Sequence, residues 1–186
     1  MKIYFTSDCH FDHDNIIKYC NRPFKNVKHM NETIIKRWNN IVTDDDLVYH
    51  IGDFSFKGLK NAQSFENVLN GSIVHIQGNH DLNNGIKSYI IKCMMFFGGK
   101  DVFVQHHPPE ELPFCDFVIC GHIHDKWKFK IHKSNPSIPI INVGVDVNQF
   151  APVSTNSVLR QYRDIKGKYC RKNMYGEFKE IKDGKK

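Results

Sequence analysis

A chain of 186 residues, of which 40% are hydrophobic and 12% aromatic, is long enough for one domain with a substantial core. No apolar run approaches the length of a membrane-spanning helix, and the N-terminus carries no signal-peptide pattern. The six cysteines form no Cys-x-x-Cys pair, which favours reduced thiols and a cytoplasmic protein over a secreted disulfide scaffold. The net charge of +6 allows a polyanionic partner.

The first half of the chain is predicted to alternate strands and helices. Strands are expected from short apolar runs at residues 2–6, 47–51 and 72–77. Helices are expected at residues 11–19, 30–41 and 62–69. A proline at position 23 follows the first helix, and Gly71 is placed to end the third. This order is typical of a partly parallel sheet covered by helices.

The second half is predicted to be rich in strands, and we expect a second sheet there. Strands are expected at residues 88–92, 94–97, 102–105, 117–120, 126–132 and 138–143. In the fifth, Trp127, Phe129 and Ile131 alternate with lysines, which indicates a sheet with one solvent-facing side. A helix over 158–165 would complete a single domain, 1–165. Residues 166–186, with eight Lys or Arg against three acidic residues, would form a basic C-terminal tail.

Polar motifs follow five of the apolar runs. In chain order they are Asp8-Cys9-His10, Gly52-Asp53, Gly78-Asn79-His80-Asp81, His106 and Gly121-His122-Ile123-His124. Because each motif sits at the end of a predicted strand, we expect one edge of a sheet to gather all five. Carboxylates, imidazoles and an amide without thiolates suit Mn, Fe, Zn, Co or Ni. There are more donors than one ion needs, so two divalent metal ions are predicted, with Asp53 shared between them.

This order of motifs, D-x-H, G-D, G-N-H-D, H and G-H-x-H, resembles the calcineurin-like metallophosphoesterase superfamily. The resemblance covers roughly residues 2–165. Within the superfamily, the chain looks like the small bacterial or phage-type members. The resemblance implies a mixed α/β fold, a four-layer αββα sandwich of two mixed β-sheets with the metals at the strand ends. It also implies hydrolysis of phosphate esters.

The resemblance also implies a role for each motif residue. One metal ion would be held by Asp8, His10, Asp53 and His124. The second would be held by Asp53, Asn79, His106 and His122. His80 would be the catalytic imidazole, oriented by Asp81, and would act as a general acid. Manganese is the preferred metal, with Fe, Zn, Ni and Co as alternatives.

Four further side chains are candidates for substrate binding: His13, Arg22, Lys57 and His107. A guanidinium can clamp a phosphate bidentately, although a solvated basic side chain is the alternative for Arg22 and Lys57. His106 and His107 are adjacent, so only one of them is expected to bind metal, and His107 is then a neighbour of the site or faces the substrate.

Together these features predict a dimetal phosphoesterase that hydrolyses phosphodiesters of small nucleotide-like substrates, by in-line attack of a metal-bridging hydroxide. A metal-dependent nuclease, with nucleic acid as its partner, is an alternative that the basic tail favours. A phosphomonoesterase is another. A non-enzymatic scaffold is disfavoured because His80 and every predicted ligand are present. A phosphate ester is the expected partner, and a membrane is not.

Overall fold

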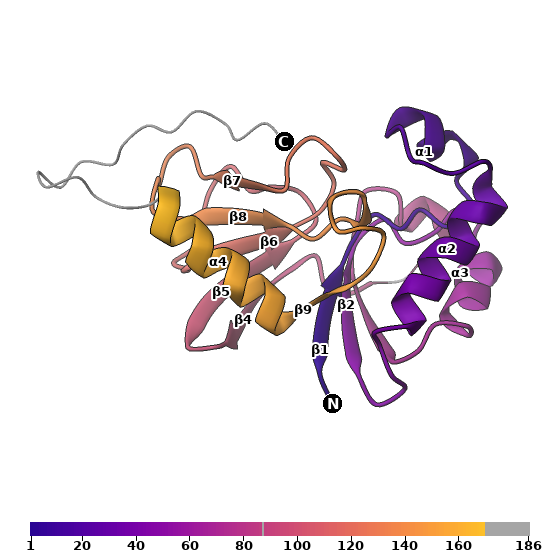
Figure 1. Ribbon diagram of the computed structural model, residues 1–186, viewed down its shortest axis with the longest axis horizontal. Coiled ribbons are helices and arrows are strands. Elements are labelled where there is room, and N and C mark those ends of the chain that lie inside the picture. The colour runs from indigo at the N-terminus through magenta and orange to yellow at the C-terminus, as the bar shows by residue number, and fades with distance from the viewer. Residues whose placement is uncertain (87, 170–186) are drawn as a thin grey trace, which may run out of the picture.

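The computed structural model describes residues 1–86 and 88–169, which fold into two β-sheets with their helices (Figure 1). The elements are β1 (Ile3–Thr6), α1 (Asp14–Tyr19), α2 (Val27–Asn39), β2 (Leu47–Ile51), α3 (Leu59–Glu66), β3 (Ser72–Ile76), β4 (Lys92–Phe97), β5 (Lys100–Gln105), β6 (Phe117–Cys120), β7 (Phe129–Ile131), β8 (Pro139–Asn142), β9 (Val153–Ser154) and α4 (Thr155–Tyr169). Short 3-10 helices lie at Leu82–Asn84 and Val145–Val147.

The first sheet has the strand order β3-β2-β1-β9. Strands β1, β2 and β3 run parallel, and their register places Leu47 opposite both Ile3 and Ser72. Strand β9 pairs antiparallel with β1 at the edge. Because the three parallel strands end at the same edge, the loops that follow them lie side by side.

The second sheet has the strand order β4-β5-β6-β8-β7. Its three central strands are parallel, and β4 and β7 are antiparallel at its edges. Both sheets are therefore mixed, and the predicted fold class, a mixed α/β sandwich of two mixed sheets, is confirmed.

The main core lies between the two sheets. Phe5 and Ile51 of the first sheet share one cluster with Ile119 of the second, and all three are fully buried. Helix α4 crosses the second sheet in Figure 1, and its Tyr162 ring stacks on Phe117 with centroids 4.7 Å apart. Burial of each such side chain contributes about 1.5–3 kcal/mol, so this core fixes how the sheets meet.

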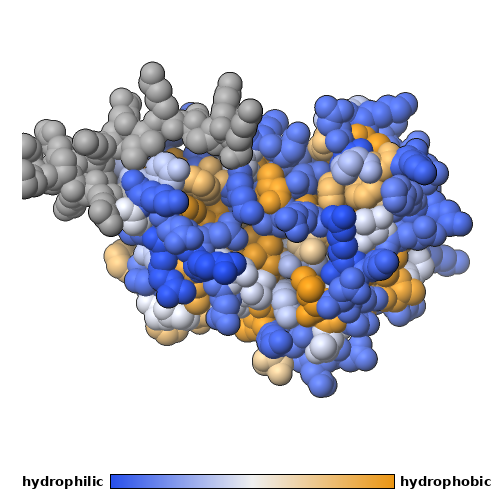
Figure 2. Space-filling view, viewed as in Figure 1, coloured by the Kyte–Doolittle hydropathy of each residue, from blue (hydrophilic) through white to orange (hydrophobic). Residues whose placement is uncertain are grey.

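The opposite face of the first sheet is covered by α1, α2 and α3. Tyr4 and Val48 point to this face and pack with Met30, Ile34 and Trp38, which are spaced at one helical turn along α2. The periodicity that predicted this helix therefore marks its buried side. Figure 2 shows that most of the surface in this view is hydrophilic.

Two predicted strands differ from the structure, and at each a side chain hydrogen-bonds a backbone carbonyl. Residues 88–91 form no strand, and β4 begins at Lys92: the Ser88 hydroxyl donates to the His75 carbonyl, and Ile90 makes a single bridge, to Ile76. Strand β7 covers three residues, and in the segment before it the Trp127 carbonyl accepts a hydrogen bond from the Asn142 amide.

Two helix ends also differ from the prediction. Helix α3 ends at Glu66, and Gly71, with φ +87°, serves the turn into β3 instead. Helix α4 continues through Tyr169, past the predicted start of the tail, and the Tyr169 ring lies 5.1 Å from that of Phe129. The rest of the predicted tail lies outside the described residues. Within the described part of the chain, no helix has the length and apolar character needed to cross a membrane.

Candidate metal centre

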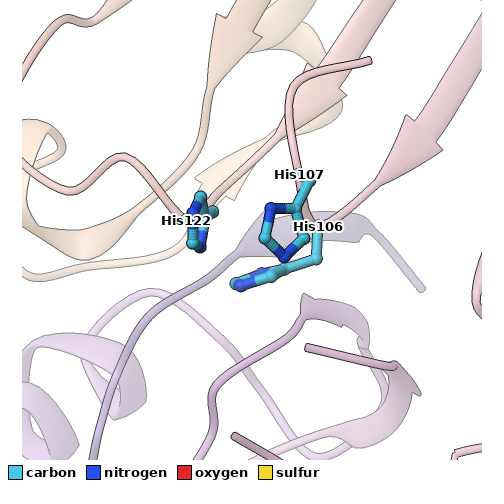
Figure 3. A group of neighbouring side chains, drawn as sticks. All are labelled: His106, His107 and His122. Carbon is cyan, nitrogen blue, oxygen red and sulfur yellow. The ribbon is translucent and has the colours of Figure 1, made fainter. Parts of the chain in front are cut away.

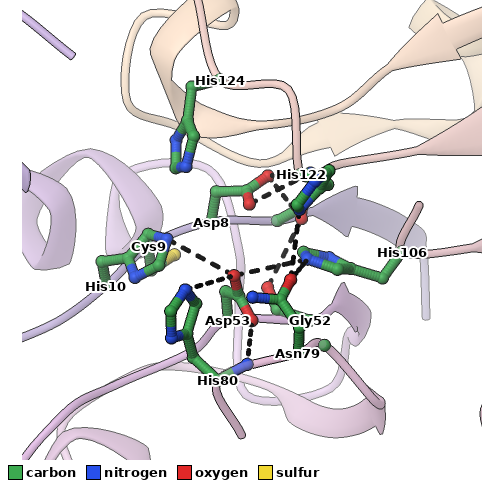
Figure 4. Close-up of polar contacts among 12 residues, drawn as sticks. Asp8, Cys9, His10, Gly52, Asp53, Asn79, His80, His106, His122 and His124 are labelled. Atoms are coloured by element: carbon green, nitrogen blue, oxygen red, sulfur yellow. Dashed lines mark hydrogen bonds and ion pairs between the residues drawn. The ribbon is translucent and has the colours of Figure 1, made fainter. Parts of the chain in front are cut away.

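All five motifs come together at the carboxyl ends of the strands (Figure 4). The loops after β1, β2 and β3 of the first sheet supply four predicted ligands: Asp8, His10, Asp53 and Asn79. The loops after β5 and β6 of the second sheet supply three: His106, His122 and His124. The site therefore lies where the edges of the two sheets meet.

The Asp53 carboxylate is at the centre of this group. Its Oδ2 atom lies 3.6 Å from His10 Nε2 and 3.3 Å from His106 Nε2, on opposite sides in Figure 4. Its Oδ1 atom accepts a hydrogen bond of 3.0 Å from the backbone N–H of His80. One carboxylate oxygen thus faces a ligand from each predicted metal group, which is the position that a shared ligand requires.

The ligands of the first predicted metal are close enough to share an ion. Asp8, His10 and His124 each offer one donor atom, and these atoms lie within 4.8 Å of one another. Asp8 also forms such a group with Asp53 and His106, so its carboxylate stands between the two sets.

The ligands of the second predicted metal surround the Asn79 amide. Its Oδ1 atom lies 3.1 Å from His106 Nε2 and 3.1 Å from His122 Nδ1. His107 joins them, with its ring centroid 3.8 Å from that of His122 (Figure 3). Burial and repulsion from His107 lower the pKa of His122 to about 4, which keeps this imidazole in the neutral form that binds metals.

The donors fit divalent cations. Both ring nitrogens of His10 are buried, and neither has a hydrogen-bond partner among the described residues. Buried polar atoms normally have a partner, and a cation between His10, Asp8 and Asp53 would supply one. Oxygen and nitrogen donors of this kind suit the borderline divalent metals.

The electrostatics of the site also favour added positive charge. Burial raises the pKa of the Asp8 carboxyl. Burial disfavours the charged form of His106, yet its hydrogen bond to Asp53 and the attraction of Asp8 outweigh this and raise the pKa of His106 to about 9. The same competition, with Asp146 as the partner, raises the pKa of His124 to about 10. Buried carboxylates therefore draw positive charge to this edge of the sheets.

The backbone is unusual at five of the predicted ligands. Asp8, His10, Asp53, His122 and His124 have φ values of 59°, 51°, 60°, 69° and 47°. Non-glycine residues rarely adopt this left-handed region, and each such residue carries a strain of about 1–3 kcal/mol. The surrounding structure therefore holds these five ligand residues in a conformation they would not adopt readily by themselves.

Two motif glycines allow the loops to approach closely. A Cβ on Gly78 would overlap the Asp53 carboxylate, and a Cβ on Gly121 would overlap the side chains of Ser7 and Asp8. The G-N-H-D and G-H-x-H motifs thus need glycine because their backbones pass against the carboxylates of other motifs.

The prediction that Asp81 orients His80 is wrong. The Asp81 carboxylate accepts hydrogen bonds from the backbone N–H groups of Asp53, Phe54 and Gly78, at 2.9, 3.0 and 2.7 Å. Its side chain therefore ties the loop after β2 to the loop after β3. It holds Asp53 in place, and within the described part of the chain its carboxylate bonds these backbone groups and not the His80 ring.

The prediction that Arg22 clamps a substrate phosphate is also wrong. Arg22 is 4% exposed, and its guanidinium donates to both oxygens of Asp146, at 2.8 and 2.9 Å, and to the backbone carbonyls of Asp8 and Cys9. The Arg22 guanidinium thus stabilises the loop after β1, which carries the predicted ligands Asp8 and His10. Asp146 was missed by the sequence analysis because it belongs to no motif.

The other substrate candidates differ in their surroundings. His13 stacks on Phe56 with ring centroids 3.8 Å apart and lines a cavity of about 310 Å³ together with His10, His80 and His124. His107 lies beside the predicted ligands His106 and His122, as described above. Lys57 is mostly exposed and lies 3.7 Å from Asp12. Cys20 also lines the cavity and lies near His124, a neighbour that the sequence analysis did not anticipate.

The comparisons with known proteins agree with this geometry. The model of the calcineurin-like phosphoesterase superfamily domain matches residues 1–149. An uncharacterized protein of Methanocaldococcus jannaschii is 42% identical over 174 residues, which cover 91% of this chain and 95% of that protein. The chain therefore belongs to the calcineurin-like phosphoesterase superfamily, as its motifs implied. This membership supports a metal-dependent phosphoesterase that acts on phosphate esters.

One solved structure shares the fold over most of the chain. The crystal structure of a protein of unknown function from Aquifex aeolicus has a TM-score of 0.65 and 23% identity, and the match covers 86% of this chain and 98% of that one. A structure described as a novel archaeal phosphodiesterase is more distant, with a TM-score of 0.45 and 22% identity over 77% of this chain and 84% of its own.

Proposed function

We propose that this chain is a dimetal phosphodiesterase for small nucleotide-like esters. The observation that carries the proposal is the Asp53 carboxylate, whose Oδ2 atom lies between His10 and His106. The first cation would be held by Asp8, His10, Asp53 and His124. The second would be held by Asp53, Asn79, His106 and His122. When bound, two such cations activate water and neutralise the charge that develops on the phosphoryl oxygens.

His80 is placed to handle the proton of the leaving group. Its side chain is 45% exposed and lines the cavity beside His10 and His124, and its Nε2 atom lies 4.0 Å from Asp53 Oδ2. Its backbone N–H is fixed by the other oxygen of Asp53. A proton on Nε2 would pass to the leaving alkoxide oxygen as the P–O bond breaks.

Metal analysis of the purified protein, with an ester panel, tests the proposal. We expect about two divalent ions per chain and turnover of diesters in Mn that stops on chelation and returns when Mn is added back. Asp53→Asn should lose both ions, whereas Asp44→Asn, at an exposed turn, should keep them.

The outcomes separate the alternatives. Preference for monoesters or for oligonucleotide would replace the diester assignment with a phosphomonoesterase or a nuclease. If the protein bound no metal and hydrolysed no ester, the non-enzymatic scaffold would be the remaining alternative.

A further inference from the structure

A second and larger cavity, of about 430 Å³, is lined by residues that adjoin two of the predicted ligand loops in the chain. Two of the segments that line it are next to predicted ligands in the chain. Pro108 and Pro109 follow His106 and His107 in the chain, and Ile123 separates His122 from His124; the two prolines and the isoleucine all line the cavity. The chain thus leads directly from the predicted ligands to an open cavity of a size typical of ligand sites.

The lining is apolar with a few cationic groups. Trp127, Ile131 and Ile140 contribute flat and branched apolar surface, in addition to the two prolines and Ile123. Lys130 and Lys133 bring ammonium groups, against one carboxylate from Glu110. This combination suits a planar, partly apolar ring that carries hydrogen-bond acceptors.

Hydrogen bonds connect the cavity lining to the loops that carry predicted ligands. The buried Asn142 side chain donates from Nδ2 to the Trp127 carbonyl and to the His124 carbonyl, each at 2.9 Å. One amide thus fixes both the cavity wall and a ligand loop. On the other side, His132 Nε2 lies 3.1 Å from the Glu110 carbonyl, which ties the loop after His107 to the segment after β7. These contacts build the space before any ligand arrives.

We propose that this cavity binds the nucleobase of a nucleotide ester whose phosphate lies at the metal centre. The base packs against Trp127 and the prolines, and Lys130 and Lys133 donate hydrogen bonds to the carbonyl and ring-nitrogen acceptors that nucleobases present. The assignment rests on the proposed phosphodiesterase function, and it selects nucleotides over small alkyl diesters. Stacking of a base on an aromatic side chain is a large enough contribution to binding to decide substrate preference.

Two esters with the same leaving group test this selection. Methyl p-nitrophenyl phosphate and the p-nitrophenyl ester of thymidine 5′-phosphate both release nitrophenolate, and only the second carries a base. We expect wild-type kcat/KM to be higher for the thymidine ester. Trp127→Leu and Lys130→Gln should each lower kcat/KM for that ester about tenfold and leave the methyl ester unchanged. Lys128→Gln is the matched control, because this exposed lysine is two residues before Lys130 in the chain and does not line the cavity.

Tryptophan fluorescence gives a readout that needs no turnover. The chain has two tryptophans, and Trp38 is fully buried against the first sheet. Titration with thymidine 5′-phosphate should quench the wild-type emission, and Trp127→Leu should abolish the quenching.

The results separate the two proposals. Equal losses on both esters, or a wild-type enzyme that treats them alike and shows no quenching, would overturn the nucleobase site. Quenching without turnover of either ester would overturn the phosphodiesterase assignment and leave the nucleobase site standing.

Discussion

The Nδ1 atom of His124 lies 3.0 Å from Oδ2 of Asp146, a carboxylate that also receives two hydrogen bonds from the buried Arg22. A carboxylate on the far nitrogen of a ligand imidazole fixes the ring orientation and raises its basicity, and loss of such a partner typically costs about 10–100-fold in metal affinity. We therefore expect Asp146→Asn to weaken Mn binding by about this factor. Titration of the chelated protein with Mn measures it, and Asp164→Asn, exposed on α4, is the control. Unchanged affinity in Asp146→Asn would remove this residue from the site.

Arg22 is expected to act on stability rather than on substrate binding. Arg22→Gln leaves the buried Asp146 carboxylate without its full partner, and breaking a buried ion pair typically costs about 3–5 kcal/mol in the free energy of unfolding. Urea denaturation measures this change, with the exposed Lys57→Gln as a control that should differ little from wild type. A variant of normal stability with a raised KM would restore the phosphate-clamp interpretation.

Asp81 is expected to hold two loops together. Asp81→Ala removes the acceptor of three backbone N–H groups, and because the residue is 1% exposed, water cannot replace it readily. We expect a loss of about 3 kcal/mol in the free energy of unfolding, with weaker metal binding because Asp53 is no longer fixed. Thermal and urea unfolding measure the first, and Mn titration the second. Asp44→Ala, at an exposed position, should change neither.

His80→Ala separates proton donation from metal binding. We expect both metal ions and the fold to be retained, and turnover of an alkyl ester to fall by about 10²–10⁴. The deficit should shrink for a p-nitrophenyl ester, because nitrophenolate leaves without a proton. The test compares kcat for the two esters in wild type and variant, with metal content checked in parallel. A deficit of the same size on both leaving groups would contradict the general-acid role.

Asp46 makes a pH-dependent contribution to the free energy of unfolding, and this contribution is independent of the metal centre. Hydrogen bonds from the backbone N–H groups of Thr43 and Lys2 hold the pKa of the Asp46 carboxyl below its ordinary value of 3.8. A lowered pKa in the folded state means that the stabilisation is present above the unfolded value and is lost as pH falls through the folded one. Asp46→Ala should therefore be less stable than wild type at neutral pH. The difference between their free energies of unfolding should narrow below pH about 4. Urea denaturation from pH 7 to pH 3 follows this difference.

Much of the fold could be predicted because short apolar runs bounded by polar residues mark strands. The structure has β2 at Leu47–Ile51 and β6 at Phe117–Cys120, with the bounds expected from the sequence. Prediction failed where side chains hydrogen-bond backbone carbonyls. The Ser88 hydroxyl donates to the His75 carbonyl and the Asn142 amide donates to the Trp127 carbonyl, and such contacts between residues distant in the chain leave no trace in hydrophobic periodicity.

The grouping of the site could be predicted because each motif follows a strand, whereas the partners of individual side chains could not. Arg22 and Asp146 are 124 residues apart in the chain, and only the packing of the loop after β8 against the loop after α1 brings them together. Asp81 follows His80 directly, which suggested a contact, yet its carboxylate turns toward the loop after β2.

Each sheet supplies only some of the predicted ligands, four from the first and three from the second. A fragment that stops before β4 would thus offer an ion an incomplete set of donors, however well its own strands folded. A small change in the angle between the sheets would move the two sets of predicted ligands relative to each other before it opened either hydrophobic cluster. Substitutions at the sheet-to-sheet contact, far from any motif, are consequently a route by which catalysis can be tuned without altering one catalytic side chain.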